Sequence, residues 1–192
     1  MSGKRSKYLL IATSVLILIG AGTILLSKRS PTVQSANTDL SGKPRLLTSF
    51  TQNGVQVEVS LEKDATGQTS VAATYRPLNA GYHLYSKDLP RTGIDGVGRP
   101  SLLEISGNGV QSTGALLESV PTIKLNATWS KEPVPVYPEG PVTLRLPIKF
   151  LEDSVSPIVA KLSLTYETCS ATTCFPPVVG KTIPVTLQEP NQ

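Results

Sequence analysis

Short stretches in which apolar and polar residues alternate dominate the chain after residue 40. The clearest runs from Val55 to Leu61, where every second side chain is apolar, and this spacing predicts a half-buried β-strand. Turn residues separate it from further predicted strands at 71–75, 82–86, 102–105, 122–128, 142–150, 158–166 and 183–187. Pro147 lies inside one of these stretches and predicts an edge strand or a bulge, because proline cannot donate a ladder hydrogen bond.

No segment after residue 40 repeats its apolar residues with the 3.6-residue period of a helix. Sixteen prolines and fifteen glycines, spread along the chain, suit a protein with many turns. About eight short strands with turns between them favour an all-β protein built as a β-sandwich. Residues 87–100 are too long for a simple hairpin, and loops of this kind often serve function.

The first thirty residues differ from the rest of the chain. Residues 8–26 carry no charge and follow three basic residues, and a helix of this length nearly spans the roughly 30 Å apolar core of a bilayer. A signal peptide usually has a shorter apolar region, of about 7–15 residues. We expect residues 1–29 to be an uncleaved anchor, with a signal segment cleaved near residues 20–22 as the alternative. A polar linker at 30–44 and a domain at 45–192 would follow.

The charge of the chain does not indicate nucleic-acid binding. The formal net charge is +4, but five basic residues flank the apolar segment and the remainder is near neutral. His83 is the only histidine, and together with two cysteines it would leave a tetrahedral zinc ion one ligand short. We therefore predict no nucleic-acid partner, no metal and no bound cofactor.

The only two cysteines, Cys169 and Cys174, lie between two predicted strands and precede Phe175, Pro176 and Pro177. They can form a disulfide if the chain turns back between them, and an exported domain could retain such a bond. Because the closed loop is short, the entropic stabilisation would be only about 2 kcal/mol. This modest gain leaves two interpretations open. The bond is either a structural staple or an exchangeable disulfide, which needs an accessible sulfur and a populated thiolate.

Two separated motifs resemble one protein family. The sequence Cys169-x4-Cys174-Phe-Pro-Pro, after a Leu-Thr-Tyr strand, is similar to the cysteine hairpin of the N-terminal periplasmic domain of DsbD-type thiol:disulfide interchange proteins. Residues 81–86, Gly-Tyr-His-Leu-Tyr-Ser, resemble that family's Gly-aromatic-His-hydrophobic-Tyr-Ser stretch. Residues 98–101, Gly-Arg-Pro-Ser, resemble its downstream Gly-x-Pro-Thr segment. The resemblance covers about residues 45–187.

The resemblance implies an immunoglobulin-like β-sandwich that passes electrons through Cys169 and Cys174 to exported thioredoxin-fold proteins or other disulfide-bearing clients. It also implies that Cys174 joins the partner and that Cys169 resolves the mixed disulfide. The sequence has one apolar segment rather than a multi-helix membrane domain. We therefore expect the electron donor to be a separate membrane-embedded thiol reductant.

Five further residues are candidates for supporting the cysteines or binding a partner: Tyr82, Tyr85, Phe175, Pro176 and Pro177. The two-residue period of a strand places Tyr82 and Tyr85 on opposite faces. The resemblance places the Tyr85 strand beside the cysteine hairpin, where the phenol could donate a hydrogen bond to sulfur. The other three either fix the turn or form a rigid apolar rim for a partner.

The environment of the cysteines in the sequence contains charges of both signs. Glu167 would oppose thiolate formation, whereas Lys161 and Lys181 are the nearest cations. We predict an oxidoreductase-like electron-transfer module, held by a single pass through a bacterial inner membrane with its domain in the periplasm. The alternative is a non-catalytic adhesion or assembly domain in which the hairpin disulfide is purely structural.

Overall fold

The computed structural model describes residues 43–152, 154 and 156–188. All regular secondary structure in these ranges is β-strand, which confirms the all-β prediction for this part of the chain. Across the same ranges we find no helix with the length and apolar character needed to cross a membrane. The predicted anchor at 1–29 and nearly all of the predicted linker at 30–44 lie outside the described residues.

The larger of two sheets is antiparallel. Its strands, in spatial order, are β1 (Arg45–Gln52), β2 (Val55–Lys63), β3 (Thr69–Pro77), β10 (Val142–Phe150) and β6 (Val110–Ser112), and β7 (Leu117–Glu118) also pairs with β10. The turn between β1 and β2 consists of Asn53 and Gly54, whose φ angles are 51° and 74°. Two positive φ angles in an Asn-Gly turn match the twist of a tight hairpin, so the local sequence determines this connection.

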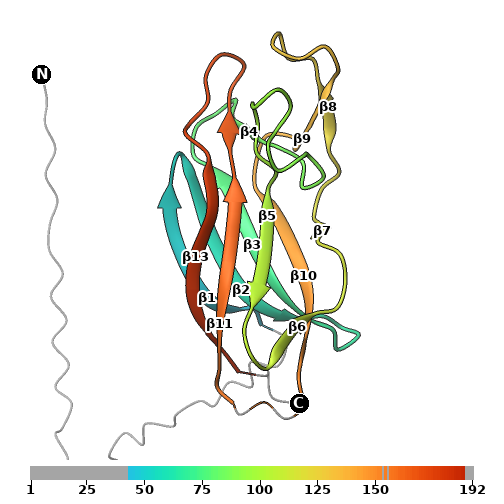
Figure 1. Ribbon diagram of the computed structural model, residues 1–192, viewed down its shortest axis with the longest axis vertical. Coiled ribbons are helices and arrows are strands. Elements are labelled where there is room, and N and C mark those ends of the chain that lie inside the picture. Colours follow the sequence, from blue (N-terminus) through green and yellow to red (C-terminus); the bar gives the residue numbers. More distant parts are fainter. Residues whose placement is uncertain (1–42, 153, 155, 189–192) are drawn as a thin grey trace, which may run out of the picture. The chain divides into compact units, whose positions relative to one another are not determined.

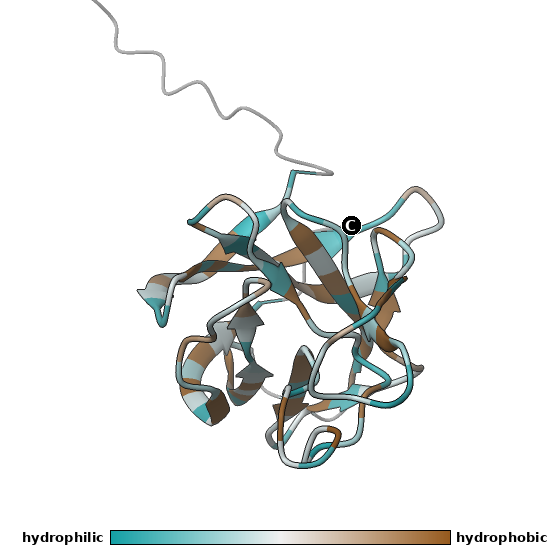
Figure 2. Ribbon diagram, turned by 90° about the horizontal axis from the view of Figure 1, so that it is seen from above, coloured by the Kyte–Doolittle hydropathy of each residue, from teal (hydrophilic) through white to brown (hydrophobic). Residues whose placement is uncertain are grey.

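The second sheet has three antiparallel strands and faces the first (Figure 1). Its order is β13 (Val178–Leu187), β11 (Ile158–Tyr166) and β5 (Leu102–Ser106). Apolar and polar residues alternate along the strands (Figure 2), so each sheet turns one apolar face to the other. Val57, Leu144 and Leu162 in this shared core are 0% exposed. The predicted sandwich is therefore present.

Buried tyrosines connect the two sheets. The Tyr75 hydroxyl on β3 donates a 2.8 Å hydrogen bond to the Leu102 carbonyl on β5, and the Tyr75 ring meets the Tyr166 ring edge-on at 5.5 Å. The Tyr166 hydroxyl donates to the Gln52 carbonyl at 3.1 Å. Burial and the neighbouring phenols raise the pKa of Tyr75 far above its usual value. These rings therefore stay neutral hydrogen-bond donors inside the core.

The prediction of an edge strand or a bulge at Pro147 is wrong. β10 pairs with β3 on one side and with β7 and β6 on the other, and its register with β3 runs unbroken through Pro147. Thr113 donates a 2.9 Å hydrogen bond to the Pro147 carbonyl, and in a strand a residue's N–H and C=O point to the same side. The missing N–H of Pro147 therefore faces the gap between β6 and β7, where the ladder needs no donor.

One end of the sandwich carries two short ribbons, at the top in Figure 1. One pairs β4 (His83–Leu84) with β12 (Thr168–Cys169), and the other pairs β8 (Ile123–Leu125) with β9 (Val134–Val136). Strands β1, β6, β7, β9 and β12 are absent from our sequence-based predictions. Four of these five have at most three residues each, too few to show a period.

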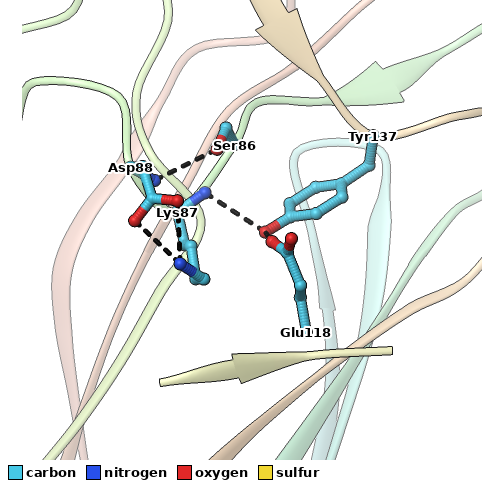
Figure 3. Close-up of polar contacts among 5 residues, drawn as sticks. All are labelled: Ser86, Lys87, Asp88, Glu118 and Tyr137. Carbon is cyan, nitrogen blue, oxygen red and sulfur yellow. Dashed lines mark hydrogen bonds and ion pairs between the residues drawn. The ribbon is translucent and has the colours of Figure 1, made fainter. Parts of the chain in front are cut away.

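A polar network fixes the start of the long loop at this end (Figure 3). The Tyr137 hydroxyl donates a 2.7 Å hydrogen bond to Glu118 on β7 and accepts one at 3.2 Å from the Lys87 backbone N–H. The Ser86 hydroxyl accepts a hydrogen bond from the Asp88 N–H at 3.1 Å. Because Tyr137 is 0% exposed, these bonds anchor the loop from beneath.

A large-to-small substitution tests which face of β11 forms the core. Leu162 is 0% exposed, whereas Val159 on the same strand is 69% exposed. Leu162→Ala should lower the free energy of unfolding by about 2–5 kcal/mol, because it removes buried methyl groups and leaves a cavity. Val159→Ala should change that free energy by about 0.5 kcal/mol or less. Urea unfolding of the full chain in detergent measures both, and equal effects would contradict this assignment of the core.

Candidate functional site

The cysteine hairpin is attached to the sandwich through the backbone of β4. Cys169 lies opposite His83 and Thr168 opposite Leu84 in the β4–β12 ladder. The Thr168 hydroxyl adds a 3.0 Å hydrogen bond to the His83 carbonyl. Beyond β12 the chain reverses, so that Cys169 also pairs with Cys174, and the Phe175 N–H donates to the Thr168 carbonyl at 3.0 Å. Both cysteines are therefore held by backbone pairing.

The turn between the cysteines stabilises itself. The Ser170 N–H donates a 2.8 Å hydrogen bond to the Thr173 carbonyl, and the Ser170 hydroxyl accepts bonds from the N–H groups of Thr172 and Thr173 at 3.3 and 3.1 Å. A serine hydroxyl that bonds to backbone groups two or three residues ahead is typical of such turns. The turn brings Cys169 and Cys174 together in a disulfide with an S–S length of 2.02 Å.

The two sulfur-bearing residues differ in exposure. Cys169 is 1% exposed, whereas Cys174, which pairs with it across the turn, is exposed. A reagent approaching from solvent therefore meets Cys174 first. If it attacks that sulfur, the electrons of the broken bond leave on the buried sulfur of Cys169.

Four side chains, those of Cys169, His83, Glu167 and Tyr85, share one face of the β4–β12 ribbon and its continuation. Cys169 lies opposite His83, and because side chains alternate along a strand, Glu167 and Tyr85 fall on that same face, one pair further along. The His83 and Tyr85 rings meet edge-on at 5.5 Å. Tertiary pairing thus assembles this cluster from two segments more than eighty residues apart.

Tyr85 contacts the buried sulfur directly. It is 1% exposed, and its hydroxyl lies 3.2 Å from the Cys169 Sγ as a hydrogen-bond donor. Burial, and to a smaller extent the charge of Glu167, raises the pKa of Tyr85 to about 12. The backbone is held as well, since the Ser101 hydroxyl donates to the Tyr85 carbonyl at 2.8 Å. The phenol is therefore a fixed neutral donor aimed at sulfur.

Glu167 brings a carboxyl group to the same sulfur. Its side chain is 8% exposed, and its Oε1 lies 4.0 Å from the Cys169 Sγ. The carboxyl oxygen and both sulfurs lie within 4.8 Å of one another. Burial raises the pKa of Glu167, and the positive charge of Arg99 offsets this rise only in part. The sequence prediction treats Glu167 only as a charge opposing the thiolate. Its position two residues before Cys169 in an extended segment is the signal for a shared face.

A small apolar cluster encloses the buried end of the disulfide. Cys169 packs with Tyr85, Leu89, Val134 and Val136. Leu125 and Ala127 contribute from β8 and the loop after it, and Ile94 from the long loop. These segments lie far from the cysteines in sequence and carry no motif, so they are absent from the sequence-based predictions of the site. They exclude water from Cys169 while leaving Cys174 at the surface.

Phe175 and the two prolines directly follow Cys174 and form a further part of the site. The Phe175 ring packs against the half-buried Tyr82 ring, with their centroids 5.4 Å apart. The Asn53 side chain donates a 2.7 Å hydrogen bond to the Pro176 carbonyl. Phe175 is half-buried, and Pro176 and Pro177 are exposed. The β1–β2 turn therefore supports an apolar rim beside Cys174.

The absence of a side chain at Gly54 in that turn leaves room for the Phe175 ring. A Cβ at position 54 would lie 2.5 Å from the Phe175 Cε2, and the φ angle of +74° also disfavours other residues. The sequence predictions contain no role for this glycine, although the Asn-Gly pair is a turn signal.

His83 and Lys181 contact aromatic rings rather than the sulfurs, His83 through Tyr85 and Lys181 through Phe50. Among the described residues the His83 Nε2 is the one buried side-chain nitrogen or oxygen that lacks a hydrogen-bond partner. Burial lowers the pKa of His83, so its imidazole is neutral near pH 7. Lys181 lies over the Phe50 ring, 5.0 Å from its centroid. Glu167, Cys169 and Cys174 are close enough together to be considered as metal ligands, but cysteine binds metal as a thiolate. While the disulfide is formed, we therefore assign no metal site to these described residues.

No family model and no curated protein matches the sequence. The fold is similar to the N-terminal periplasmic domain of ScsB from Proteus mirabilis, at 13% identity and a TM-score of 0.47. That match covers 76% of this chain and 51% of the ScsB chain, about half its length. The fold is also similar to the DsbD n-terminal domain of Neisseria meningitidis in its reduced form. This second match has 18% identity and a TM-score of 0.41, and it covers 70% of this chain and 84% of that one.

Both neighbours are described as N-terminal domains, and the second comes from DsbD, whose family the two sequence motifs resemble. Both TM-scores lie below 0.5, so the chemistry of the site is inferred from its own residues.

The contact between Gly54 and Phe175 can be tested with a matched pair of glycine substitutions. Gly54→Ala should destabilise the fold by about 1–3 kcal/mol more than Gly96→Ala, because overpacking adds to the backbone strain. Gly96 has a similar φ of +83°, but a Cβ at that position would have no atom within 4 Å. Urea unfolding of the full chain measures the difference. An intact Phe175–Tyr82 nuclear Overhauser effect together with equal destabilisation would contradict the role of Gly54.

Proposed function

We propose that the domain is an exported thiol–disulfide exchange module that passes electrons through the Cys169–Cys174 pair. The observation that carries the proposal is the asymmetry of the disulfide. Cys174 is exposed beside the apolar rim, whereas Cys169 is 1% exposed and lies 3.2 Å from the Tyr85 hydroxyl. Exchange needs one sulfur that a partner can reach and a second that can leave.

The chemistry proceeds by two successive attacks of a thiolate on a disulfide. A donor thiolate attacks the Cys174 Sγ, the bond to Cys169 breaks, and Cys169 takes the electron pair. The donor's second thiolate then attacks the donor's first sulfur, which is bonded to Cys174, and releases Cys174 as a thiolate. In the forward reaction with an oxidised client, Cys174 attacks the client disulfide and Cys169 resolves the resulting mixed disulfide. Two electrons pass in each half-reaction and no bound cofactor takes part.

We also propose the partners and the setting of this reaction. The rim of Phe175, Pro176 and Pro177 is rigid, because proline restricts the backbone, and it would pack against the active site of a thioredoxin-fold protein or another disulfide-bearing client. A separate membrane-embedded thiol reductant would supply the electrons. Residues 1–29 would anchor the immunoglobulin-like domain at 45–192 to a bacterial inner membrane, with the linker at 30–44 between them. The domain would lie in the periplasm, where a disulfide persists.

The competing function is that of an adhesion or assembly domain whose disulfide only stiffens the hairpin. The backbone bonds of the Ser170 turn already close this loop without the disulfide. A bond across a loop this short adds only about 2 kcal/mol on chain-entropy grounds. The polar groups aimed at Cys169 would have no purpose in a staple. Exchange therefore accounts for more of the site.

A redox titration of the full chain in detergent distinguishes the two functions. The expected midpoint is above about −300 mV, because structural disulfides usually lie below that value. Alkylation followed by mass measurement reports the oxidised fraction. A bond that stays oxidised below that potential, with thiols that react only after unfolding, would refute the proposal.

Cysteine variants test which sulfur the partner meets. Cys169→Ser should trap mixed disulfides on Cys174 when the chain is incubated with an oxidised thioredoxin-fold protein, because no resolving thiol remains. Cys174→Ser should trap few, because Cys169 is 1% exposed. Non-reducing electrophoresis compares the two yields, and similar yields would contradict the assignment.

Removing the Tyr85 hydroxyl tests the donor to the buried sulfur. A hydrogen bond to a charged group contributes about 1.5–3 kcal/mol. We take about half of this energy to lower the activation free energy of the step in which the Cys169 thiolate leaves. Tyr85→Phe should therefore slow reduction by dithiothreitol about three- to tenfold. Tyr82→Phe is the control, since its ring packs on Phe175. A Tyr85→Phe rate equal to that of the control would show that the hydrogen bond does not stabilise the leaving thiolate.

A further inference from the structure

We propose that Glu167 is a catalytic acid and base of the exchange reaction, which delivers a proton to the Cys169 sulfur as it leaves and removes that proton when Cys169 attacks. This inference rests on the proposed function and extends it to a residue outside the cysteine motif. It assigns to the carboxyl group a role that neither the disulfide nor Tyr85 can fill.

The position of the carboxyl supports this role. The Glu167 Oε1 lies 4.0 Å from the Cys169 Sγ, and both side chains project from the same face of one extended segment. Glu167 is 8% exposed and Cys169 is 1% exposed, so bulk water has little access to the leaving sulfur. A sulfur that becomes a thiolate in such a place needs a proton from a neighbouring group.

The surroundings of Glu167 favour a carboxyl that carries its proton and can also lose it. Burial raises the pKa of Glu167, which keeps the acid form populated to a higher pH than in water. Arg99 in the long loop acts in the opposite direction through its positive charge. Its guanidinium donates to the carbonyls of Thr92, Gly96 and Gly98, so it stays in place and would stabilise the carboxylate formed after transfer.

The other groups that face this site cannot replace Glu167. Tyr85 holds its proton up to a pKa of about 12, so it can donate a hydrogen bond to sulfur but is a weak acid. His83 is neutral near pH 7, since burial lowers its pKa, and its Nε2 has no hydrogen-bond partner among the described residues. Glu167 is thus the group whose acid form can supply a proton to Cys169.

Electrons and protons balance in each half of this exchange. A donor thiolate attacks the Cys174 Sγ and forms a new S–S bond, while the Cys169–Cys174 bond breaks and its electron pair goes to the Cys169 Sγ. The Glu167 carboxyl gives its proton to that sulfur and becomes a carboxylate. When a client later occupies Cys174, the carboxylate takes the proton back, the Cys169 thiolate attacks the Cys174 Sγ, and the client leaves as a thiolate.

The experiment measures the rate constant for reduction of the disulfide by dithiothreitol, in the full chain in detergent, from about pH 4 to pH 8. The rate constant is divided by the fraction of dithiothreitol present as thiolate at each pH. The proton is available below the raised pKa of Glu167 and is lost as the pH rises through it. The wild-type rate constant should be level at low pH and fall about tenfold or more through that range, since acid–base groups commonly contribute 10²–10⁴-fold. Glu167→Gln should stay at the lower level at every pH.

Two comparisons decide what the carboxyl does. If Glu167 acted only by repelling the thiolate, the neutral Glu167→Gln variant would keep the low-pH rate constant of the wild type at every pH. This outcome would overturn the proposal. Glu58→Gln, which changes an exposed glutamate on β2, should follow the wild-type profile. A Glu58→Gln profile that matches Glu167→Gln would also overturn it, because the effect would then come from overall charge.

Three further outcomes complete the test. If Glu167→Gln fails to fold, the wild-type chain still reports proton transfer through a solvent deuterium isotope effect at low pH that disappears at high pH, and its absence would refute the proposal. If the wild-type disulfide does not react in the folded chain, the proposed function fails together with this inference. A reactive disulfide with a level pH profile would refute the role of Glu167 alone.

Discussion

The arrangement of polar groups around the buried sulfur depends on the backbone pairing between β12 and β4. The ladder aligns Cys169 with His83, and the strand period then brings Tyr85 and Glu167 to the same face. The turn at Ser170 adds the second cysteine to this framework. A one-residue slip in this ladder would turn Tyr85 away from Cys169 and remove its 3.2 Å contact with the sulfur.

The sandwich provides the rigidity that this arrangement needs. The segment that contains Cys169 continues directly from β11, whose Leu162 and Leu164 are 0% exposed. On the other side, β4 is held by the Tyr137 N–H, which donates to the Leu84 carbonyl at 2.8 Å. Rotamers locked by packing hold a site more precisely than loops alone. The two sheets therefore act as a frame, and the reactive groups gather at one end of it.

The site carries polar groups that a purely structural hairpin would not need. Glu167 is buried with its Oε1 4.0 Å from the Cys169 Sγ, and the His83 Nε2 lacks a hydrogen-bond partner in the described part of the chain. A buried polar atom without a partner costs about 1–3 kcal/mol. Natural proteins tolerate such costs mainly at functional sites. This local instability beside the disulfide is consistent with a site shaped for reaction with a partner.

Much of this protein can be predicted from the sequence alone, and the physical reason is that those features are local. The alternation from Val55 to Leu61 predicts a half-buried strand, and the two cysteines five positions apart can meet only through a reversal. The Asn53–Gly54 pair is an equally local turn signal, although our sequence-based predictions do not use it. The cysteine motif and the segment around Tyr85 also identify the type of domain that the chain resembles.

Tertiary structure decided everything that depends on residues distant in sequence. It placed Pro147 in an interior strand, because its missing N–H faces a gap between two neighbouring strands. It buried Cys169 against Val134 and Val136 while exposing Cys174, and it brought Arg99 near Glu167. These outcomes depend on strand order and register, which a single sequence leaves open because an apolar strand face can pair with several partners.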